Sequence, residues 1–140
     1  MMSVEANKKI IEEMFRAQLA GDMDSYGKIL ADDLQWEIMQ FGIERPRSKE
    51  EMMTMLGAVH RSLGGGKWEK RATSMVGEGD RLAVEAEAMM ELSNGNIYRN
   101  RYHYLYRLRD GQVFFAREYL DTHAAVEAFK GMPSTVPADD

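Results

Sequence analysis

The chain has 140 residues, 44% of them hydrophobic and 29% charged, and a formal net charge of −5. This composition is typical of a globular domain with its own core, and the negative charge argues against nucleic acid as a partner. The chain has no cysteine, which excludes disulfides and thiolate metal sites, and no apolar stretch long enough to cross a bilayer. Because the first residues also lack a signal-peptide pattern, we expect a cytoplasmic protein with no membrane partner.

Two helices and a strand are expected in the first 40 residues. Ser3 is placed to cap the first helix, whose apolar residues recur at helical spacing. Asp22 or Asp24 caps a short second helix. Alternation then places Trp36 and Ile38 on the same face of a strand.

A third helix is expected after a proline-containing loop. Ser48 and Glu51 form a serine-x-x-glutamate capping box at its start, and its apolar stripe includes Met55 and Val59. The glycines at residues 64–66 end this helix. They lack the lysine–serine or lysine–threonine pair of a phosphate-binding loop, so they indicate a helix end and not a nucleotide site.

The second half of the chain alternates polar and apolar residues and predicts strands. The expected strands cover residues 68–76, 81–92, 97–108 and 112–120. A short last helix is expected from Asp121 or Thr122, and residues 134–140 are expected to form a flexible tail. Helices followed by antiparallel strands predict a single α+β domain over residues 1–133, whose curved sheet wraps around the helices and encloses a cavity.

The turn at Asn94–Gly95 sets the register of the first hairpin. This dipeptide favours a two-residue type I′ turn, which would pair Glu87 with Tyr102. Residues paired across two strands share a face of the sheet. The same face would then also carry Glu85, Met89 and Asn100.

The second turn, at residues 109–111, leaves two registers open. A three-residue loop with Gly111 in the left-handed conformation pairs Tyr102 with Glu118, whereas a two-residue turn would move Glu118 to the opposite face. We adopt the three-residue loop because it gathers four arginines on one face, which are hard to bury. Glu118 and Leu120 would then point inward. The outer face, expected to form a homodimer interface, would comprise Ala86, Ala88, Met90, Arg99, Arg101, His103, Arg117 and Tyr119.

Several segments resemble a SnoaL-like domain. They are residues 20–24, residues 30–36, residues 104–113 and residues 116–122. The resemblance spans nearly the whole chain and implies the cone of the nuclear transport factor 2-like superfamily, in which helices pack into a strongly bent antiparallel sheet. This superfamily includes polyketide cyclases, ketosteroid isomerases and limonene-epoxide hydrolases, and its members are commonly homodimers through the outer sheet face.

The resemblance also implies which residues match the catalytic positions of the epoxide hydrolases. Glu85 and Glu87 match an arginine-x-aspartate pair on one strand, and Glu118 matches an aspartate on the last strand. Trp36 and Ile38 fall where a tyrosine and an asparagine help to hold the water, and the base of the isomerases would fall at or next to Ile38. Only the acid of the last strand is retained.

Glu118 is the main catalytic candidate. Burial in an apolar cavity raises the pKa of a carboxyl group, which can then act as a general acid or base near neutral pH. The alternative is that Glu118 is structural, bonded to a tyrosine and a buried water. Glu87 and Tyr102 are the other predicted catalytic residues, and Asn100 either orients a ligand carbonyl or bonds the backbone at a strand end. The predicted ligand-binding residues are Trp36, Ile38, Met55, Val59, Glu85, Met89, Asn100 and Leu120.

Two classes of function remain open at this point. One is a cofactor-free acid–base enzyme of the cyclase, isomerase or hydratase type, acting on a small apolar molecule. The other is a non-catalytic domain of the same fold that binds a small ligand or serves as a dimeric interaction domain. The three histidines, His60, His103 and His123, are not expected to converge, so no metal site is predicted.

Overall fold

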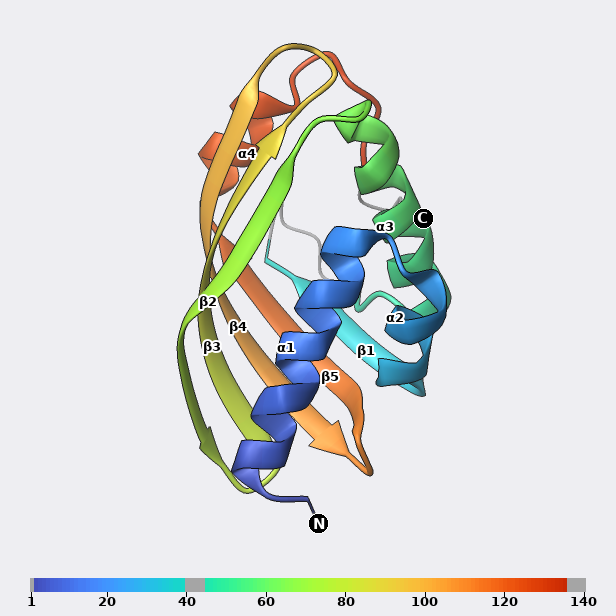
Figure 1. The fold of residues 1–140 in the computed structure, drawn as a ribbon, viewed down its shortest axis with the longest axis vertical. Helices are drawn as coiled ribbons and strands as arrows, with labels where there is room; N and C mark the ends of the chain where they lie inside the picture. The colour runs from blue at the N-terminus through green and yellow to red at the C-terminus, as the bar shows by residue number, and fades with distance from the viewer. Residues whose placement is uncertain (1, 40–44, 136–140) are drawn as a thin grey trace.

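A computed structural model describes residues 2–39 and 45–135 and shows the expected α+β architecture (Figure 1). The helices are α1 (Val4–Ala20), α2 (Met23–Ile29), α3 (Lys49–Leu63) and α4 (Thr122–Ala128). The strands are β1 (Leu30–Ile38), β2 (Trp68–Glu78), β3 (Arg81–Glu91), β4 (Ile97–Arg109) and β5 (Gln112–Leu120). The part of the predicted tail after Thr135 lies outside the described residues.

The helices start and end at the signals read from the sequence. The Ser3 hydroxyl accepts a hydrogen bond from the backbone N–H of Ala6 at 3.0 Å, and Ser48 and Glu51 form the complete capping box. Gly21 ends α1 with a φ of 67°, a conformation that glycine adopts without strain. These signals fix the lengths of α1 and α3, which lie on the same side of the sheet (Figure 1).

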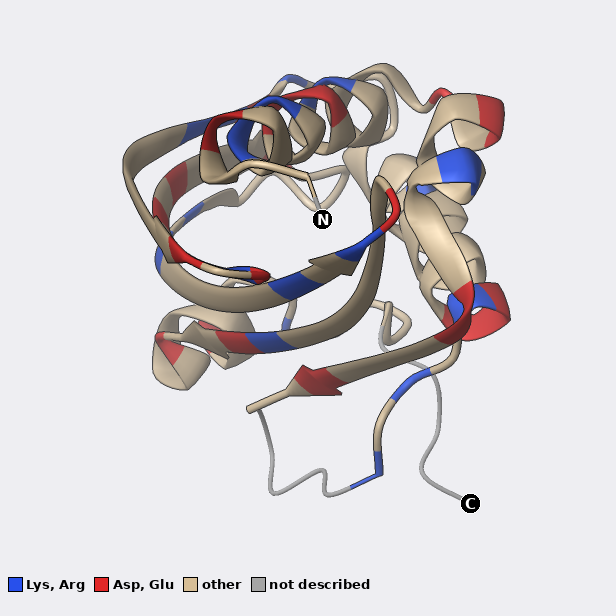
Figure 2. Ribbon diagram, turned by 90° about the horizontal axis from the view of Figure 1, so that it is seen from below, with Lys and Arg blue, Asp and Glu red and all other residues tan. Residues whose placement is uncertain are grey.

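The described strands form one curved sheet in the order β1-β5-β4-β3-β2. The sheet curls around the interior without closing, as the view from below shows (Figure 2). The pairs from β2 to β5 are antiparallel, as predicted, whereas β1 runs parallel to β5. Because β1 is joined to the next strand through α3 and not through a hairpin, no tight turn forces it to be antiparallel.

The predicted register between β3 and β4 is wrong by one residue. The loop contains three residues, Ser93 to Gly95, because the backbone N–H of Leu92 donates to the carbonyl of Asn96 at 2.9 Å. Gly95 occupies the left-handed position with a φ of 88°. As a result Ala86 lies opposite Tyr102, and every side chain of β3 is on the face opposite to the one predicted. The inward residues of β3 are Leu82, Val84, Ala86, Ala88 and Met90.

The predicted face of β5 is correct, although its partners on β4 are shifted. The loop is a two-residue turn in which both Asp110 and Gly111 have positive φ. Phe114 is an extra, unpaired residue between the pairs formed by its two neighbours, and this bulge turns the rest of β5 over. Glu118 therefore points inward, opposite Tyr104 instead of Tyr102.

The outer face of the sheet is charged. Its exposed members include Arg99, Arg101, His103 and Tyr119, as predicted, and Arg117 forms an ion pair with Glu37 at 2.8 Å. Three residues predicted on this face lie instead on the inner face, because the register of β3 differs: Ala86, Ala88 and Met90. Assembly into a homodimer through the remaining residues stays a prediction.

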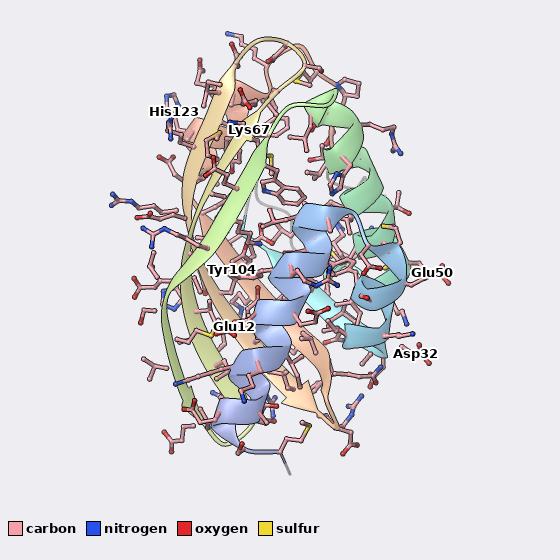
Figure 3. All side chains as sticks on the ribbon, in the orientation of Figure 1. Glu12, Asp32, Glu50, Lys67, Tyr104 and His123 are labelled. Atoms are coloured by element: carbon pink, nitrogen blue, oxygen red, sulfur yellow. The ribbon has the colours of Figure 1, made fainter. Side chains whose placement is uncertain are left out.

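The inner face carries a core rich in aromatic rings. Tyr104 is 2% exposed and points into the space between the sheet and the helices, whereas Glu12, Asp32 and Glu50 lie on the surface (Figure 3). Trp36 contacts Tyr104 and Tyr106 edge-on. β1 and β4 thus supply the aromatic rings beneath the site described below.

Candidate active site

A pocket of two adjacent lobes opens between the inner face of the sheet and the helices. The large lobe has a volume of about 260 Å³ and the small lobe about 70 Å³. Five residues line both lobes and form their junction: Met55, Val59, Met90, Tyr102 and Glu118. Glu118 therefore lines both lobes.

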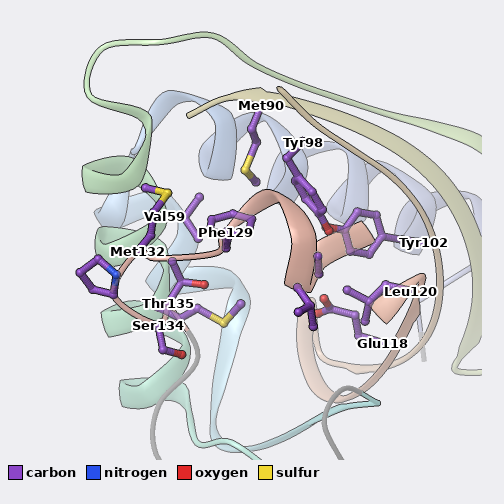
Figure 4. Close-up of a pocket in the computed structure, with 14 residues that line it drawn as sticks. Val59, Met90, Tyr98, Tyr102, Glu118, Leu120, Phe129, Met132, Ser134 and Thr135 are labelled. Carbon is purple, nitrogen blue, oxygen red and sulfur yellow. The ribbon is translucent and has the colours of Figure 1, made fainter. Parts of the chain in front are cut away.

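The two lobes differ in polarity. The large lobe is mostly apolar, with Leu120 of β5 on one side and Met132, which follows α4, on the other (Figure 4). The small lobe contains the polar groups of Gln18, Tyr26 and Lys70 in addition to the two tryptophan rings. This arrangement suits a ligand with an apolar body and one polar end.

Glu118 is buried at the junction of the lobes. Glu118 is 7% exposed, and its Oε1 atom accepts a hydrogen bond from Trp36 Nε1 at 2.9 Å. Burial raises the pKa of the Glu118 carboxyl, although the charge of Lys70 and the bond from Trp36 partly oppose this. The indole bond fixes the orientation of one carboxylate oxygen and leaves the other available to a ligand.

A ladder of tyrosine rings runs along β4, and two of them, Tyr102 and Tyr104, form part of the pocket floor. Tyr102 stacks on Tyr104 with 5.5 Å between centroids, and Tyr104 stacks on Tyr106 at 5.1 Å. The hydroxyls of Tyr98 and Tyr102 share a hydrogen bond of 2.6 Å. Burial is the main cause that raises the pKa of Tyr98 to about 12 and the pKa of Tyr102 well above its usual range. At neutral pH these phenols are neutral and can donate hydrogen bonds.

Lys70 is a pocket residue that the sequence-based prediction missed. It lies on β2 opposite Ala88, and its side chain enters the small lobe. Its Nζ donates to Gln18 Oε1 at 3.1 Å and lies 4.2 Å from the ring centroid of Phe15. The available signal was the alternation in β2, which places Lys70 on the same face as Trp68.

Burial lowers the pKa of Lys70 to about 8, and the carboxylate of Glu118 opposes this shift. A group whose pKa is depressed in the folded state contributes stability above its unfolded pKa of about 10.5 and loses it as the pH falls through 8. At neutral pH the folded protein therefore carries a cost of up to about 3 kcal/mol for charging this amine.

We expect Lys70→Met to raise the free energy of unfolding by about 1–3 kcal/mol at neutral pH. The gain over the wild type should shrink as the pH rises between 8 and 10.5. Urea unfolding at several pH values measures both effects. Lys67→Met, which replaces an exposed lysine just before β2, is the control and should change little. A Lys70→Met protein less stable than the wild type at neutral pH would contradict this account of the amine.

Two predicted acids lie outside the pocket. Glu87 is on the outer face of β3, where its carboxylate pairs with Arg71 Nη2 at 3.0 Å. Glu85 is exposed on the same face, and Met89 also points outward. The prediction for these three residues is wrong because it assumed a two-residue turn at Asn94–Gly95, which reverses the faces of β3.

Asn100 is buried on the inner face of β4, but it lines neither lobe. Its side-chain amide donates to the Asp121 carbonyl at 2.9 Å and accepts from the Asp121 backbone N–H at 3.0 Å. These bonds support the structural alternative, in which Asn100 holds the end of β5 at the start of α4. Ile38 is likewise buried in the core and lines neither lobe.

The pocket contains five of the predicted ligand-contacting and catalytic side chains besides Glu118. They are Trp36, Met55, Val59, Tyr102 and Leu120. Within residues 2–39 and 45–135, no group of three or more histidine, aspartate or glutamate side chains is arranged to hold a metal ion. In the same ranges no helix is long and apolar enough to span a membrane.

Solved structures with the same fold include several named proteins. Bal32a, from a soil-derived mobile gene cassette, has a TM-score of 0.79 at 18% identity, with 91% of this chain and 98% of that chain covered. An epoxide hydrolase of the LEH-like type from M. tuberculosis has a TM-score of 0.71 at 19% identity, with 89% of each chain covered. IdmH from Streptomyces antibioticus, a candidate polyketide cyclase, has a TM-score of 0.74 at 15% identity, with 87% and 96% covered.

The similarity to these solved structures establishes the fold, and a match to a family model establishes the family. The comparison with curated proteins gave no match. The model of the SnoaL-like domain matches residues 11–116, from the middle of α1 to the middle of β5. The chain therefore belongs to the family of SnoaL-like domains.

Proposed function

We propose that the protein is a cofactor-free acid–base enzyme that acts on a small, largely apolar molecule and uses Glu118 as its general base. The observation that carries this proposal is the position of the Glu118 carboxyl, buried at the junction of the two lobes and oriented by Trp36. A base placed there reaches a bound molecule from either lobe.

The surroundings of Glu118 suit proton transfer from carbon. Removal from water raises the pKa of the carboxyl and thus strengthens it as a base, while Lys70 and Trp36 keep the charged form accessible. The proton can return to another atom of the same molecule, which gives isomerisation, or a carbanion formed in this way can close a ring. Neutral phenols on the pocket floor supply donors for oxygen atoms that gain negative charge.

The apolar lining of the large lobe supports a substrate with an apolar body. Val59, Leu120 and Phe129 contribute hydrocarbon surface, and flexible methionines surround them. Two structural neighbours are named as an epoxide hydrolase and a candidate polyketide cyclase, which favours an enzyme over a purely structural domain.

The test is ring opening of 5-nitrobenzisoxazole, an apolar probe from which a base removes a C–H proton while the N–O bond breaks to give a phenolate. We expect turnover above buffer, with a rate that rises with pH through an apparent pKa above the usual 4.5 of a glutamate. Absorbance of the phenolate product measures the rate. A protein that binds the probe but opens it no faster than free acetate does would be a binding domain, the alternative function.

A further inference from the structure

We propose that Lys70 is a nucleophilic amine that forms an imine with an aldehyde or ketone bound in the pocket. This covalent activity goes beyond proton abstraction by Glu118. The two can fail independently, because the ring opening of 5-nitrobenzisoxazole forms no imine and imine formation removes no proton from carbon.

The geometry holds the Lys70 amine at a fixed place in the wall of the small lobe. Nζ donates to Gln18 Oε1 at 3.1 Å and lies 4.2 Å from the ring centroid of Phe15 and 4.8 Å from that of Tyr104. Lys67 is exposed, and the partly exposed Lys8 and Lys49 form ion pairs with Glu5 and Asp32 at the surface. A lysine held by one acceptor and two rings inside a pocket has already lost the rotamer freedom that an exposed lysine would lose on reacting.

The surroundings also supply the reactive form of the amine. The aromatic faces attract an ammonium group, but loss of water has the larger effect and lowers the pKa of Lys70 to about 8. The charged and titratable groups that face Nζ are Glu118 of β5 and the tyrosines Tyr102 and Tyr104 of β4. The neutral fraction of this amine at pH 7 to 8 is therefore larger than that of a lysine in water, and only the neutral amine attacks a carbonyl.

The reaction balances with groups already in the pocket. The nitrogen of Lys70 attacks the carbonyl carbon, the C=O π electrons move to oxygen, and one amine proton is transferred to that oxygen to give a carbinolamine. Protonation of its hydroxyl by Glu118 releases water and leaves an iminium, which returns a proton to Glu118 to give the imine. The net change is C=O and NH₂ to C=N and H₂O, with no oxidant or reductant.

The two lobes indicate the class of carbonyl compound. The small lobe, about 70 Å³, accommodates the reacting end next to Lys70, and the apolar large lobe, about 260 Å³, accommodates the rest. Glu118 lines both lobes, and its carboxylate interacts electrostatically with the Lys70 amine. The structure favours an aldehyde or ketone with an apolar body over a polar sugar or keto acid.

Reductive trapping tests the proposal. The folded protein is incubated at about pH 8 with benzaldehyde and sodium cyanoborohydride, which reduces an iminium to a stable benzylamine, and the modified residue is located by peptide mass spectrometry. We expect Lys70 to be benzylated at least about tenfold faster than Lys67, because a lysine in water with a pKa of about 10.4 is almost fully protonated at this pH. Labelling of Lys70 no faster than Lys67 would overturn the proposal.

Two variants keep the test decisive. Lys70→Met and Lys70→Arg should both lose the fast labelling, and Lys70→Arg keeps a positive charge beside Phe15 and Gln18 if the methionine variant does not fold. Lys67→Met should label as fast as the wild type. Fast labelling that persists in Lys70→Arg would assign the reactive amine to another residue and would overturn the proposal. This outcome is independent of whether the protein opens 5-nitrobenzisoxazole.

Discussion

Replacing Glu118 with glutamine should lower the rate of 5-nitrobenzisoxazole ring opening by about 10²–10⁴-fold, the range that a positioned general base contributes. The amide oxygen can still accept the hydrogen bond from Trp36 Nε1, so the shape of the pocket is retained. What is lost is the basic oxygen, because an amide does not take a proton at these pH values. Initial rates of the wild type and Glu118→Gln, compared across pH, measure the effect.

The same substitution should not weaken the fold. Burial raises the pKa of Glu118 in the folded state, so its contribution to stability is present below the unfolded pKa of about 4.5 and is lost as the pH rises through the folded pKa. Glu118→Gln removes this cost, and its melting temperature at neutral pH should equal or exceed that of the wild type. The difference should disappear below about pH 4.5.

Glu87→Gln is the matched control. It makes the same chemical change on the same sheet, but the Glu87 carboxylate lies on the outer face and pairs with Arg71. Its ring-opening rate should equal that of the wild type. A loss of rate in Glu87→Gln comparable to that in Glu118→Gln would mean that β3 faces the pocket with its acids, contrary to the observed register.

Gly66→Ala should lower the free energy of unfolding by about 2–4 kcal/mol. Gly66 lies between α3 and β2, where the chain passes close to the end of β3. A Cβ atom at this position would lie 2.3 Å from the carbonyl oxygen of Glu91 and 3.0 Å from that of Leu63. Both contacts are with backbone, which cannot move aside as a flexible side chain does, so the start of β2 would have to shift.

Gly57→Ala, within α3, separates this steric effect from a general intolerance of alanine. Its Cβ would meet only the flexible end of Arg61, at 3.4 Å. Alanine favours a helix over glycine, so this variant should gain about 0.5–1 kcal/mol. Urea unfolding of both variants measures the contrast. Equal stability of Gly66→Ala and the wild type would show that the connection between α3 and β2 is loose, and Lys70 would then be less firmly placed.

The two hairpins show what could and could not be predicted from the sequence. For β3, the alternation itself pointed to the correct face, because Leu82, Val84 and Met90 share one parity while three glutamates share the other. The preference of Asn94–Gly95 for a two-residue turn outweighed that pattern in the prediction. The observed loop includes Ser93 as well, and a difference of one residue in a turn reverses a whole strand.

For β5, the predicted face is correct, although the predicted turn differs from the observed one. The turn has two residues instead of three, and the unpaired Phe114 supplies the missing residue within the strand. A three-residue loop leaves Glu118 on the inner face, and so does a two-residue turn that is followed by a bulge. The inward position of Glu118 was therefore predicted correctly, whereas its partner on β4 was not. Turn preference alone does not distinguish these two solutions.

The alternation in β2 indicates the face of Lys70, but its partners could not be predicted from local sequence because they come from distant parts of the chain. Phe15 and Gln18 of α1 approach it from one side and Tyr104 of β4 from another. A lysine in a strand is usually solvent-exposed. Only the packing of α1 against the curved sheet turns this one into a pocket residue.

The extra residue in β5 also bears on how the pocket can change during evolution. If Phe114 paired with Arg107, so that the bulge were straightened, everything that follows would be displaced by one side-chain position, and Arg117 and Tyr119 would enter the pocket while Glu118 would leave it. The chemistry of the lining would be exchanged without replacing any lining amino acid. The bulge at Phe114 is therefore as important for the chemistry of the pocket as the identity of the acid at residue 118.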